Sequence, residues 1–278
     1  MQHLAAAVLT LLLLAAPASG LEACTLWAAA GEAVRGGGTL IAKNRDWLPN
    51  HQQTLRTVMP VRGYRYFGLF AEGNDRPGLK AGINEKGLTV VSATAGSLPR
   101  GEREEPGRTR GLLVRLLREC DGVAAALARP ELFRGPRHLL LADAGTIAAV
   151  EIGPEGAHAV RTRQNGTLAQ TNHYRDAALL AFNRRIGRSS DRRLGRIEAL
   201  LRAGHGPWTP EGFAALSDDR EGGPDNALWR TGGTPKRERT LAAWIVHTPP
   251  AGPASLIIRI ANPGEPTILH RLRAADLF

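Results

Sequence analysis

The chain has 278 residues and a formal net charge of +10, with 43% hydrophobic and 22% charged residues. This balance excludes a disordered or fibrous chain and allows one large globular domain or two small ones. Two cysteines, Cys24 and Cys120, are too few for a disulfide scaffold or a four-thiolate zinc site. Only 4 of the 36 basic residues are lysines. Because the arginines are scattered and aromatic residues are few, the excess fits a biased genome better than nucleic acid, a membrane surface or acidic ligands.

The first twenty residues are typical of a secretory signal. Residues 4–16 form an apolar run, which is shorter than the roughly 20 residues of a membrane span, and small residues follow at 17–20. We therefore expect residues 1–20 to be a signal peptide, 21–23 a short propeptide and 24–278 a single domain. The mature protein is expected to be periplasmic or secreted, with no stable membrane insertion after signal cleavage.

Cys24 lies just after the predicted cleavage site and allows three interpretations. Residues 21–24 resemble a lipobox, although Glu22 is a poor residue before the final small one, and this would make Cys24 a lipid anchor. Alternatively, Cys24 becomes the free N-terminal residue and acts as a nucleophile. The third interpretation is a disulfide with Cys120 in an oxidising compartment.

The first half of the chain is predicted to form hairpins followed by one helix. Alternating and β-branched patterns separated by glycine-rich turns predict strands over residues 25–30, 39–43, 55–60, 64–70 and 88–93. Turns are expected at 35–38 and 82–87. Leucines at helical spacing predict one amphipathic helix over 110–128, with Cys120 as a small core residue.

The second half is predicted to form two hairpins, a run of helices and a closing strand pair. The hairpins join residues 138–143 to 147–152 and 157–163 to 168–171. Helices are expected over 176–185, over 192–202 with Ser189, Ser190 or Asp191 as cap, and over 209–216 with Thr209 as cap. A loop over 218–238 precedes strands at 240–248 and 255–260. This order predicts an α+β fold with largely antiparallel sheets and helices outside two packed sheets.

An N-terminal cysteine would supply both groups that an amidase needs. Its thiolate is the nucleophile, and its free α-amine, with an ordinary pKa of about 7.7–8.0, can act as the base. Such a site also needs a carboxylate to orient the amine, a cation near the thiolate and donors for the oxyanion. Candidates for these groups lie in residues 43–47, 171–174 and 189–196.

These segments together resemble the N-terminal-nucleophile (Ntn) hydrolases of the choloylglycine hydrolase and acid amidase type. The resemblance is closest to the branch with isopenicillin-N acyltransferases and carcinine hydrolase-like proteins. The matching pieces are residues 24–25, 43–47, 82–88, 171–173 and 189–196, in this order. The resemblance implies a four-layer αββα sandwich of two largely antiparallel sheets flanked by helices.

The resemblance also implies a role for each matching residue. Cys24 would be the nucleophile and, through its α-amine, the base, while Asp46 would hold that amine. The side-chain amide of Asn172 and a backbone N–H near Thr94 would donate to the oxyanion. Arg193 would steady the charges of the site.

One residue departs from the family pattern, which usually reads Arg-Asn-x-Asp. Lys43 stands where the family has arginine, and a lysine lacks the planar fork for bidentate bonding. Arg45 is a candidate to compensate, although it follows two residues later on the strand. The turn over residues 84–87 is interpreted as structural.

We therefore predict an exported cysteine Ntn amidohydrolase that cleaves a linear amide through an acyl-thioester on Cys24. Resolution of the thioester by an amine instead of water would make it an acyltransferase, and a lipid-anchored envelope protein without catalysis is the further alternative. The substrate is expected to be a small N-acyl amide. No metal is expected, because the histidines show no ligand spacing with acids or cysteines. No cofactor and no nucleic-acid partner are expected either. A homo-oligomer is left open.

Overall fold

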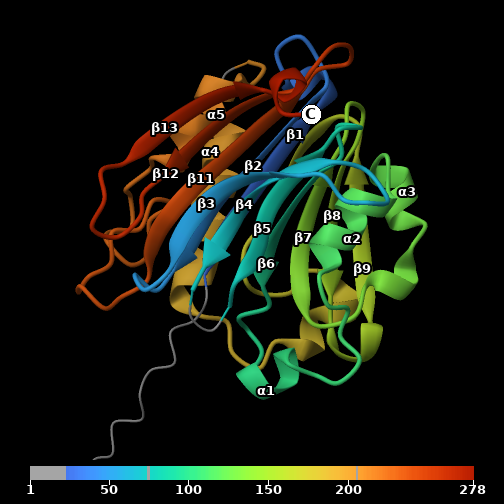
Figure 1. Cartoon of the computed structure of the whole chain (residues 1–278). Coiled ribbons are helices and arrows are strands. Elements are labelled where there is room, and N and C mark those ends of the chain that lie inside the picture. Colours follow the sequence, from blue (N-terminus) through green and yellow to red (C-terminus); the bar gives the residue numbers. More distant parts are fainter. Residues whose placement is uncertain (1–22, 74–75, 205) are drawn as a thin grey trace, which may run out of the picture.

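The computed structural model describes residues 23–73, 76–204 and 206–278 as two stacked antiparallel sheets with helices on both outer faces. The predicted signal peptide, residues 1–20, and residues 21–22 of the predicted propeptide lie outside the described residues. Figure 1 shows the two sheets lying face to face. The expected α+β class and the four-layer arrangement are confirmed.

The first sheet has six strands in the order β10-β1-β2-β11-β12-β13. Their bounds are β1 Cys24–Ala30, β2 Thr39–Trp47, β10 Gly166–Gln170, β11 Arg239–Thr248, β12 Ser255–Ile260 and β13 Ile268–Arg273. The central strands β1 and β2 are buried along their whole length. β1 is apolar on both faces apart from Thr25, whereas the second half of β2 buries Lys43, Asn44, Arg45 and Asp46.

The second sheet is an antiparallel meander of seven strands in chain order, β3 to β9. Their bounds are β3 Gln52–Val58, β4 Tyr66–Glu72, β5 Gly78–Asn84, β6 Thr89–Thr94, β7 Arg137–Ala142, β8 Ile147–Ile152 and β9 His158–Arg163. The connection from β6 to β7 carries three α-helices, which is where the meander departs from simple hairpins.

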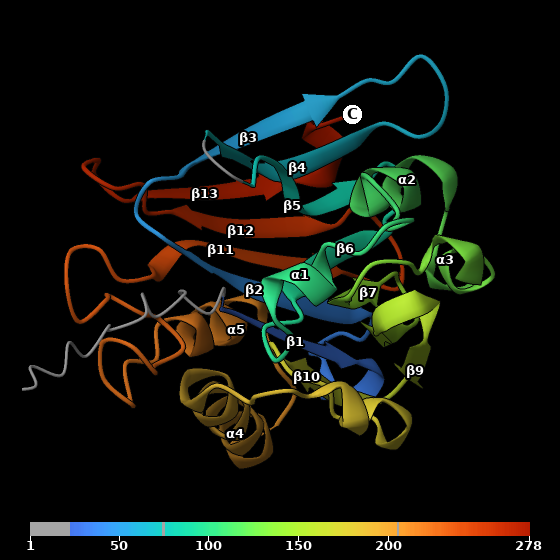
Figure 2. The ribbon, with the colours of Figure 1, turned by 90° about the horizontal axis from the view of Figure 1, so that it is seen from below.

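The helices form the two outer layers. Figure 2 shows α4 (Arg188–Ala203) and α5 (Pro210–Ser217) beneath the six-stranded sheet. On the other side, α2 (Leu112–Glu119) packs on β5 and β6, followed by α3 (Val123–Leu127). The short helix α1 is Arg100–Arg103. Single-turn 3₁₀ helices lie at 31–33, 130–132, 154–156 and 274–276, with a longer one at 177–182. No helix of the described residues is both long and apolar enough to cross a membrane.

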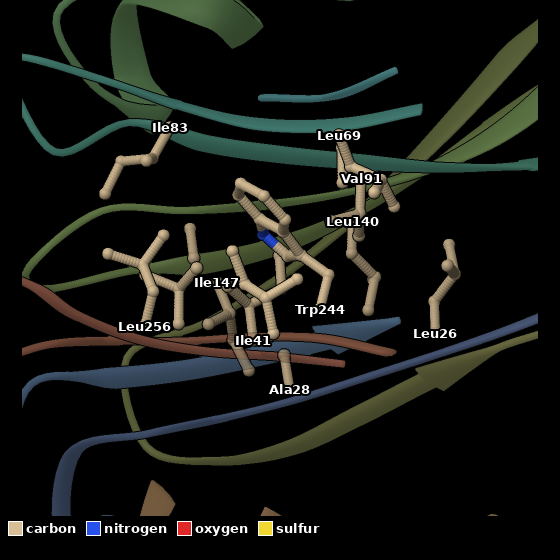
Figure 3. Close-up of a cluster of buried hydrophobic side chains, with 14 of the residues drawn as sticks. Leu26, Ala28, Ile41, Leu69, Ile83, Val91, Leu140, Ile147, Trp244 and Leu256 are labelled. Atoms are coloured by element: carbon tan, nitrogen blue, oxygen red, sulfur yellow. The ribbon is translucent and has the colours of Figure 1, made fainter. Parts of the chain in front are cut away.

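Three apolar layers hold this stack together. Between the sheets, side chains such as Leu26 and Trp244 of the first sheet pack against Leu140 of the second (Figure 3). The opposite face of β1, including Trp27, packs against α4 and α5, and a third cluster joins the seven-stranded sheet to α2 and α3. Because β1 lies between two apolar layers, its first residue is held firmly in position.

The predicted single helix over 110–128 is wrong, because the structure divides it into α2 and α3. Cys120, between them, is extended (φ −121°, ψ 135°). The Asn84 side chain donates to the carbonyls of Leu117 and Cys120 at 2.8 Å each, while Asp143 accepts the Val123 N–H at 2.7 Å. These side chains satisfy the helix ends at the break. Cys120 is 1% exposed in the core, as predicted.

Other boundaries shift for local reasons. The expected helix over 176–185 is a 3₁₀ helix at 177–182 capped by Asp176. Helix α4 begins at Arg188 after Gly187, so the expected caps at 189–191 are wrong and these residues belong to its first turn. The expected turn over 82–87 is shorter, because residues 82–84 end β5. Strand β13 was not expected, whereas Thr209 caps α5 as predicted.

Candidate active site

Cys24 is the first residue of β1, between β10 and β2 in the middle of the buried sheet. It is 4% exposed, and its side chain lies with Leu26 and Ala28 on the face toward the second sheet. Its Sγ is 4.0 Å from the backbone carbonyl oxygen of Asp46 on β2. The thiol therefore lies at the end of a rigid strand rather than on a loop.

The two faces of β2 supply different groups around Cys24. Cys24 pairs directly with Arg45, and side chains alternate along a strand, so Lys43 and Arg45 share the inner face with the thiol. Asn44 and Asp46 face the other way, toward α5 and the loop before β11. Asn44, for example, donates to the carbonyl of Ser217 at 3.0 Å.

An open cavity lies on the inner face of this strand pair. Its wall comes from both sheets and from the segment between β6 and α2. Seven of its 15 lining residues are Lys or Arg, and none of those described is Asp or Glu. The seven cations are Lys43, Arg45, Arg76, Lys80, Arg103, Arg108 and Arg137.

Lys43 links the two sheets at the floor of this cavity. Its Nζ donates to the carbonyls of Ser92 at 2.5 Å and Lys80 at 2.8 Å, and the residue is 1% exposed. Burial lowers the pKa of Lys43 from 10.5 to about 8, an effect that the thiol of Cys24 opposes and neighbouring Arg45 reinforces. The structure thus places Lys43 beside Cys24, and its catalytic role stays a prediction.

Arg45 is also buried beside Cys24, at 2% exposure. Its Nη1 donates to the carbonyl of Asp46 at 2.7 Å, and its guanidinium lies 4.2 Å from the centre of the Trp47 ring. Its Nε and Nη2 atoms are buried without a hydrogen-bond partner. The alternation of side chains along β2 is the feature of the sequence that places Arg45 on the same face of the sheet as the thiol of Cys24.

Arg193 reaches the outer face of the same site from the first turns of α4. Its Nη1 donates to the carbonyl of Cys24 and to Oγ1 of Thr25, both at 2.7 Å, and its Nη2 donates to Oδ1 of Asn172 at 3.0 Å. The side chain is fully buried. Burial lowers the pKa of Arg193 to about 10, while the nearby Asp46 opposes that shift.

Asn172 follows β10 and contacts three parts of the site. Its Oδ1 accepts the backbone N–H of Cys24 at 3.0 Å, and its Nδ2 donates to the carbonyl of Thr94 at 2.9 Å. The Asn172 N–H donates to Ser190 Oγ at 3.0 Å, which fixes the backbone of Asn172. An amide carries two N–H donors. The second remains for an oxyanion, while the Thr94 N–H at the end of β6 stays a predicted donor.

Asp46 lies in a buried polar cluster on the outer face. Its Oδ1 accepts from Oγ1 of Thr240 at 2.7 Å, and its Oδ2 is 3.8 Å from Nη1 of Arg230. Burial raises the pKa of Asp46, against the opposing charges of Arg230 and Arg193. With Ala23 attached, the backbone N–H of Cys24 bonds Asn172 rather than Asp46. The predicted contact between Asp46 and the freed amine therefore stays a prediction.

The sequence did not single out the partners of Asp46. Arg230 and Glu238 form a buried ion pair at 2.8 Å, and they lie in the segment that was predicted to be a loop. Thr240 is the second residue of β11, and its Oγ1 also accepts the Arg230 N–H at 2.9 Å. No spacing in a Gly- and Pro-rich segment predicts burial, so only the tertiary structure reveals this cluster.

A second, smaller cavity lies on the other side of Cys24. Its lining includes Ala23, Asn172, Ser190 and Arg193. Ala23 is 3% exposed and forms part of the wall of this cavity. The thiol of Cys24 therefore lines a cation-rich cavity, while the residue before it lines a separate small one.

Two alternatives from the sequence are settled by placement. Cys24 and Cys120 are both free thiols in different apolar layers, so no disulfide joins them. Asn84 is structural, since it ties its turn to α2. Among the described residues, no group of three or more His, Cys, Asp or Glu side chains is placed to hold a metal ion.

Comparisons with known proteins agree with this geometry. The family model described as acyl-coenzyme A:6-aminopenicillanic acid acyl-transferase matches residues 34–258, which include all the predicted site residues except Cys24. Two variants of conjugated bile acid hydrolase from Clostridium perfringens have similar structures, with TM-scores of 0.53 and 0.52 and identities of 12% and 14%. Each similarity covers 91% of this chain and 93% of the other, and it shows a common fold. No curated protein matches the chain.

Proposed function

We propose that this chain, which belongs to the acyl-coenzyme A:6-aminopenicillanic acid acyl-transferase family, is an exported amidohydrolase. In this proposal it cleaves linear amides through a thioester on Cys24. The family and the fold confirm the Ntn resemblance, and they identify an enzyme of the amidohydrolase or acyltransferase type. One observation supports the finer proposal: the thiol of Cys24 lines an open, cation-rich cavity while Ala23 lines a separate small one.

The first step exposes the α-amine of Cys24. Signal peptidase can cut directly before Cys24. Alternatively, after an earlier cut, the thiol attacks the carbonyl carbon of Ala23, the Ala23–Cys24 C–N bond breaks, and water hydrolyses the resulting thioester to release the preceding peptide as an acid and the free thiol. In both cases the nitrogen that becomes the free amine is the one that lies 3.0 Å from Oδ1 of Asn172. Loss of Ala23 also removes one wall of the small cavity, which enlarges the space for part of the substrate.

Acylation then uses groups that lie on both faces of β1. The Cys24 amine takes the thiol proton, and the thiolate attacks the carbonyl carbon of the substrate amide. The second amide N–H of Asn172 and the backbone N–H of Thr94 donate to the oxyanion. The Cys24 ammonium returns the proton to the leaving nitrogen, so the C–N bond breaks and a thioester remains.

Water completes the cycle. The neutral amine of Cys24 takes a proton from water, the hydroxyl attacks the thioester carbon, and a carboxylic acid and the thiol are released. If an acceptor amine replaces water, the same steps give an acyl transfer. Arg193 does not react but holds the Cys24 carbonyl and the Asn172 amide in place.

Intact-mass spectrometry of the exported protein tests the proposal. We expect a chain that begins at Cys24 and gains the mass of one acyl group when it is quenched during turnover of an N-acyl amide. Cys24→Ala should gain no acyl mass. An active chain that begins at residue 19 or 21 would overturn the mechanism, and a diacylglycerol mass on Cys24 would establish the lipid anchor instead.

A further inference from the structure

The cavity at Cys24 presents positive charge at both ends. Lys43 and Arg45 lie at the floor beside the thiol, whereas Arg108 and Arg137 come from the far wall, on the segment before α2 and on β7. Glu104 neutralises part of the neighbourhood, since it pairs with Arg76 and Arg100. Arg108 and Arg137 form no ion pair with any described residue, although Glu104 is near enough to interact with the charge of Arg108. The positive charge of the far wall is therefore only partly compensated.

The buried guanidinium of Arg45 is the second observation. Its Nε and Nη2 are buried without a partner, although its side chain is 98% removed from solvent (2% exposed) and lines the cavity. A buried charged group with unmet donors costs free energy unless a ligand completes its bonds. The guanidinium fork matches a carboxylate, sulfonate or phosphate in shape and charge.

The cations also crowd one another, which points to the same kind of ligand. Burial, together with the charges of Arg108 and Arg76, lowers the pKa of Arg137 to about 10. Arg137 therefore stays protonated at neutral pH while repelled by its neighbours. An anion in the cavity would relieve this repulsion, and a neutral or cationic ligand would not.

Building on the proposed function, we propose that the substrate carries an anionic group, which Arg45 and the far-wall residues Arg108 and Arg137 bind while its amide carbonyl lies at Cys24. The anionic group can belong to the acyl part or to the amine part of the amide. Both place the same chemistry in the cavity. The arginines select acidic N-acyl amides over neutral ones of equal length.

Matched substrates test this selection. Glutaryl p-nitroanilide carries a carboxylate on the acyl part, N-pentanoylglycine carries one on the amine part, and pentanoyl p-nitroanilide and N-pentanoylglycinamide are their neutral counterparts. We expect kcat/KM for at least one acidic substrate to exceed that of its neutral counterpart by about tenfold or more. The preference should shrink as ionic strength rises.

Single substitutions locate the selection in the cavity. Arg137→Gln should reduce the ratio of acidic to neutral kcat/KM by about tenfold. Arg108→Gln, at an exposed position that tolerates substitution, should reduce it less. Arg134→Gln removes the same charge from an exposed residue that does not line the cavity, and it should leave the ratio unchanged.

Binding to mature Cys24→Ala separates this inference from the proposed function. Calorimetry should show tighter binding of an acidic probe than of its neutral counterpart, and Arg137→Gln in the same background should abolish the difference. Equal or weaker binding of both acidic probes would overturn the inference, even if the wild-type enzyme forms a thioester. Selective binding of an acid without any thioester in the wild-type protein would overturn the proposed function and retain the anion site.

Discussion

The two faces of the β1–β2 pair differ in how their buried arginines are bonded. On the outer face, Arg193 satisfies three acceptors of Cys24, Thr25 and Asn172, and Asp46 bonds Thr240. On the inner face, Arg45 keeps two nitrogen atoms without partners and lines an open cavity. Every guanidinium nitrogen of Arg193 thus has an acceptor, whereas Arg45 keeps unmet donors, although Asp46 Oδ2 and Arg230 Nε on the outer face also lack a hydrogen bond.

This difference separates positioning from binding. A buried polar network whose members are paired fixes geometry, because every movement breaks hydrogen bonds. Donors that remain unmet beside a cavity are available to a ligand. We therefore assign the outer face to holding Cys24 and Asn172, and the inner face to the substrate.

The largest effect is expected where the two faces meet, at Cys24. Cys24→Ala should lower kcat for amide hydrolysis by at least about 10⁴-fold, because no other thiol lies in the site. Cys120→Ala is the matched control, since Cys120 is buried in another layer. It should lower the free energy of unfolding and keep the activity. Retained hydrolysis by Cys24→Ala would contradict the assignment of the nucleophile.

The next effect concerns the charge of Asp46 on the outer face. Asp46→Asn should lower kcat by about 10³-fold, by analogy with other carboxylates that orient a catalytic base. Burial raises the pKa of Asp46, so the folded protein favours its neutral form. Wild-type stability should therefore fall, relative to the variant, as pH rises through the raised pKa. Urea denaturation across pH measures this, and a parallel pH dependence in both proteins would contradict it.

Arg193 tests the positioning role of the outer face. Arg193→Leu removes the donors to Cys24 and Asn172, and it should lower kcat by about 100-fold, because small displacements at a reacting centre cost about that much. The free energy of unfolding should fall by about 3 kcal/mol, because buried acceptors lose charged donors. Arg192→Leu, on the exposed side of α4, is the control. If both variants lower kcat and the free energy of unfolding equally, Arg193 has no positioning role in the site.

The smallest effect is a shift in pH dependence at the inner face. The pKa of Lys43 is lowered to about 8, so its charge is lost as pH rises above that value. If that charge supports the thiolate, activity should decline on the alkaline side of the profile. Lys43→Arg keeps the charge and should move this decline to higher pH. Lys86→Arg, on an exposed turn, is the control and should leave the pH of this decline unchanged. If the decline stays at the same pH in Lys43→Arg, the charge of Lys43 does not support the thiolate.

Much of the fold followed from local patterns in the chain. Hairpin signals such as Asn165-Gly166, and the pattern of residues 25–30 before a glycine-rich turn, predicted strands that the structure contains. The helix over 110–128 was divided because Asn84 and Asp143, distant in sequence, bond its interior. Leucine spacing gives no sign of such partners.

The sequence by itself determined the predicted site: Cys24, Lys43, Asp46, Asn172 and Arg193 stand out by type, order and resemblance. Only the tertiary structure decided which of them meet on which face. It also placed Arg230 and Thr240 at Asp46 and gathered cations from four distant segments into one cavity. The physical reason is that strand alternation sets a side chain's face locally, whereas the partners across that face come from strands and helices far along the chain.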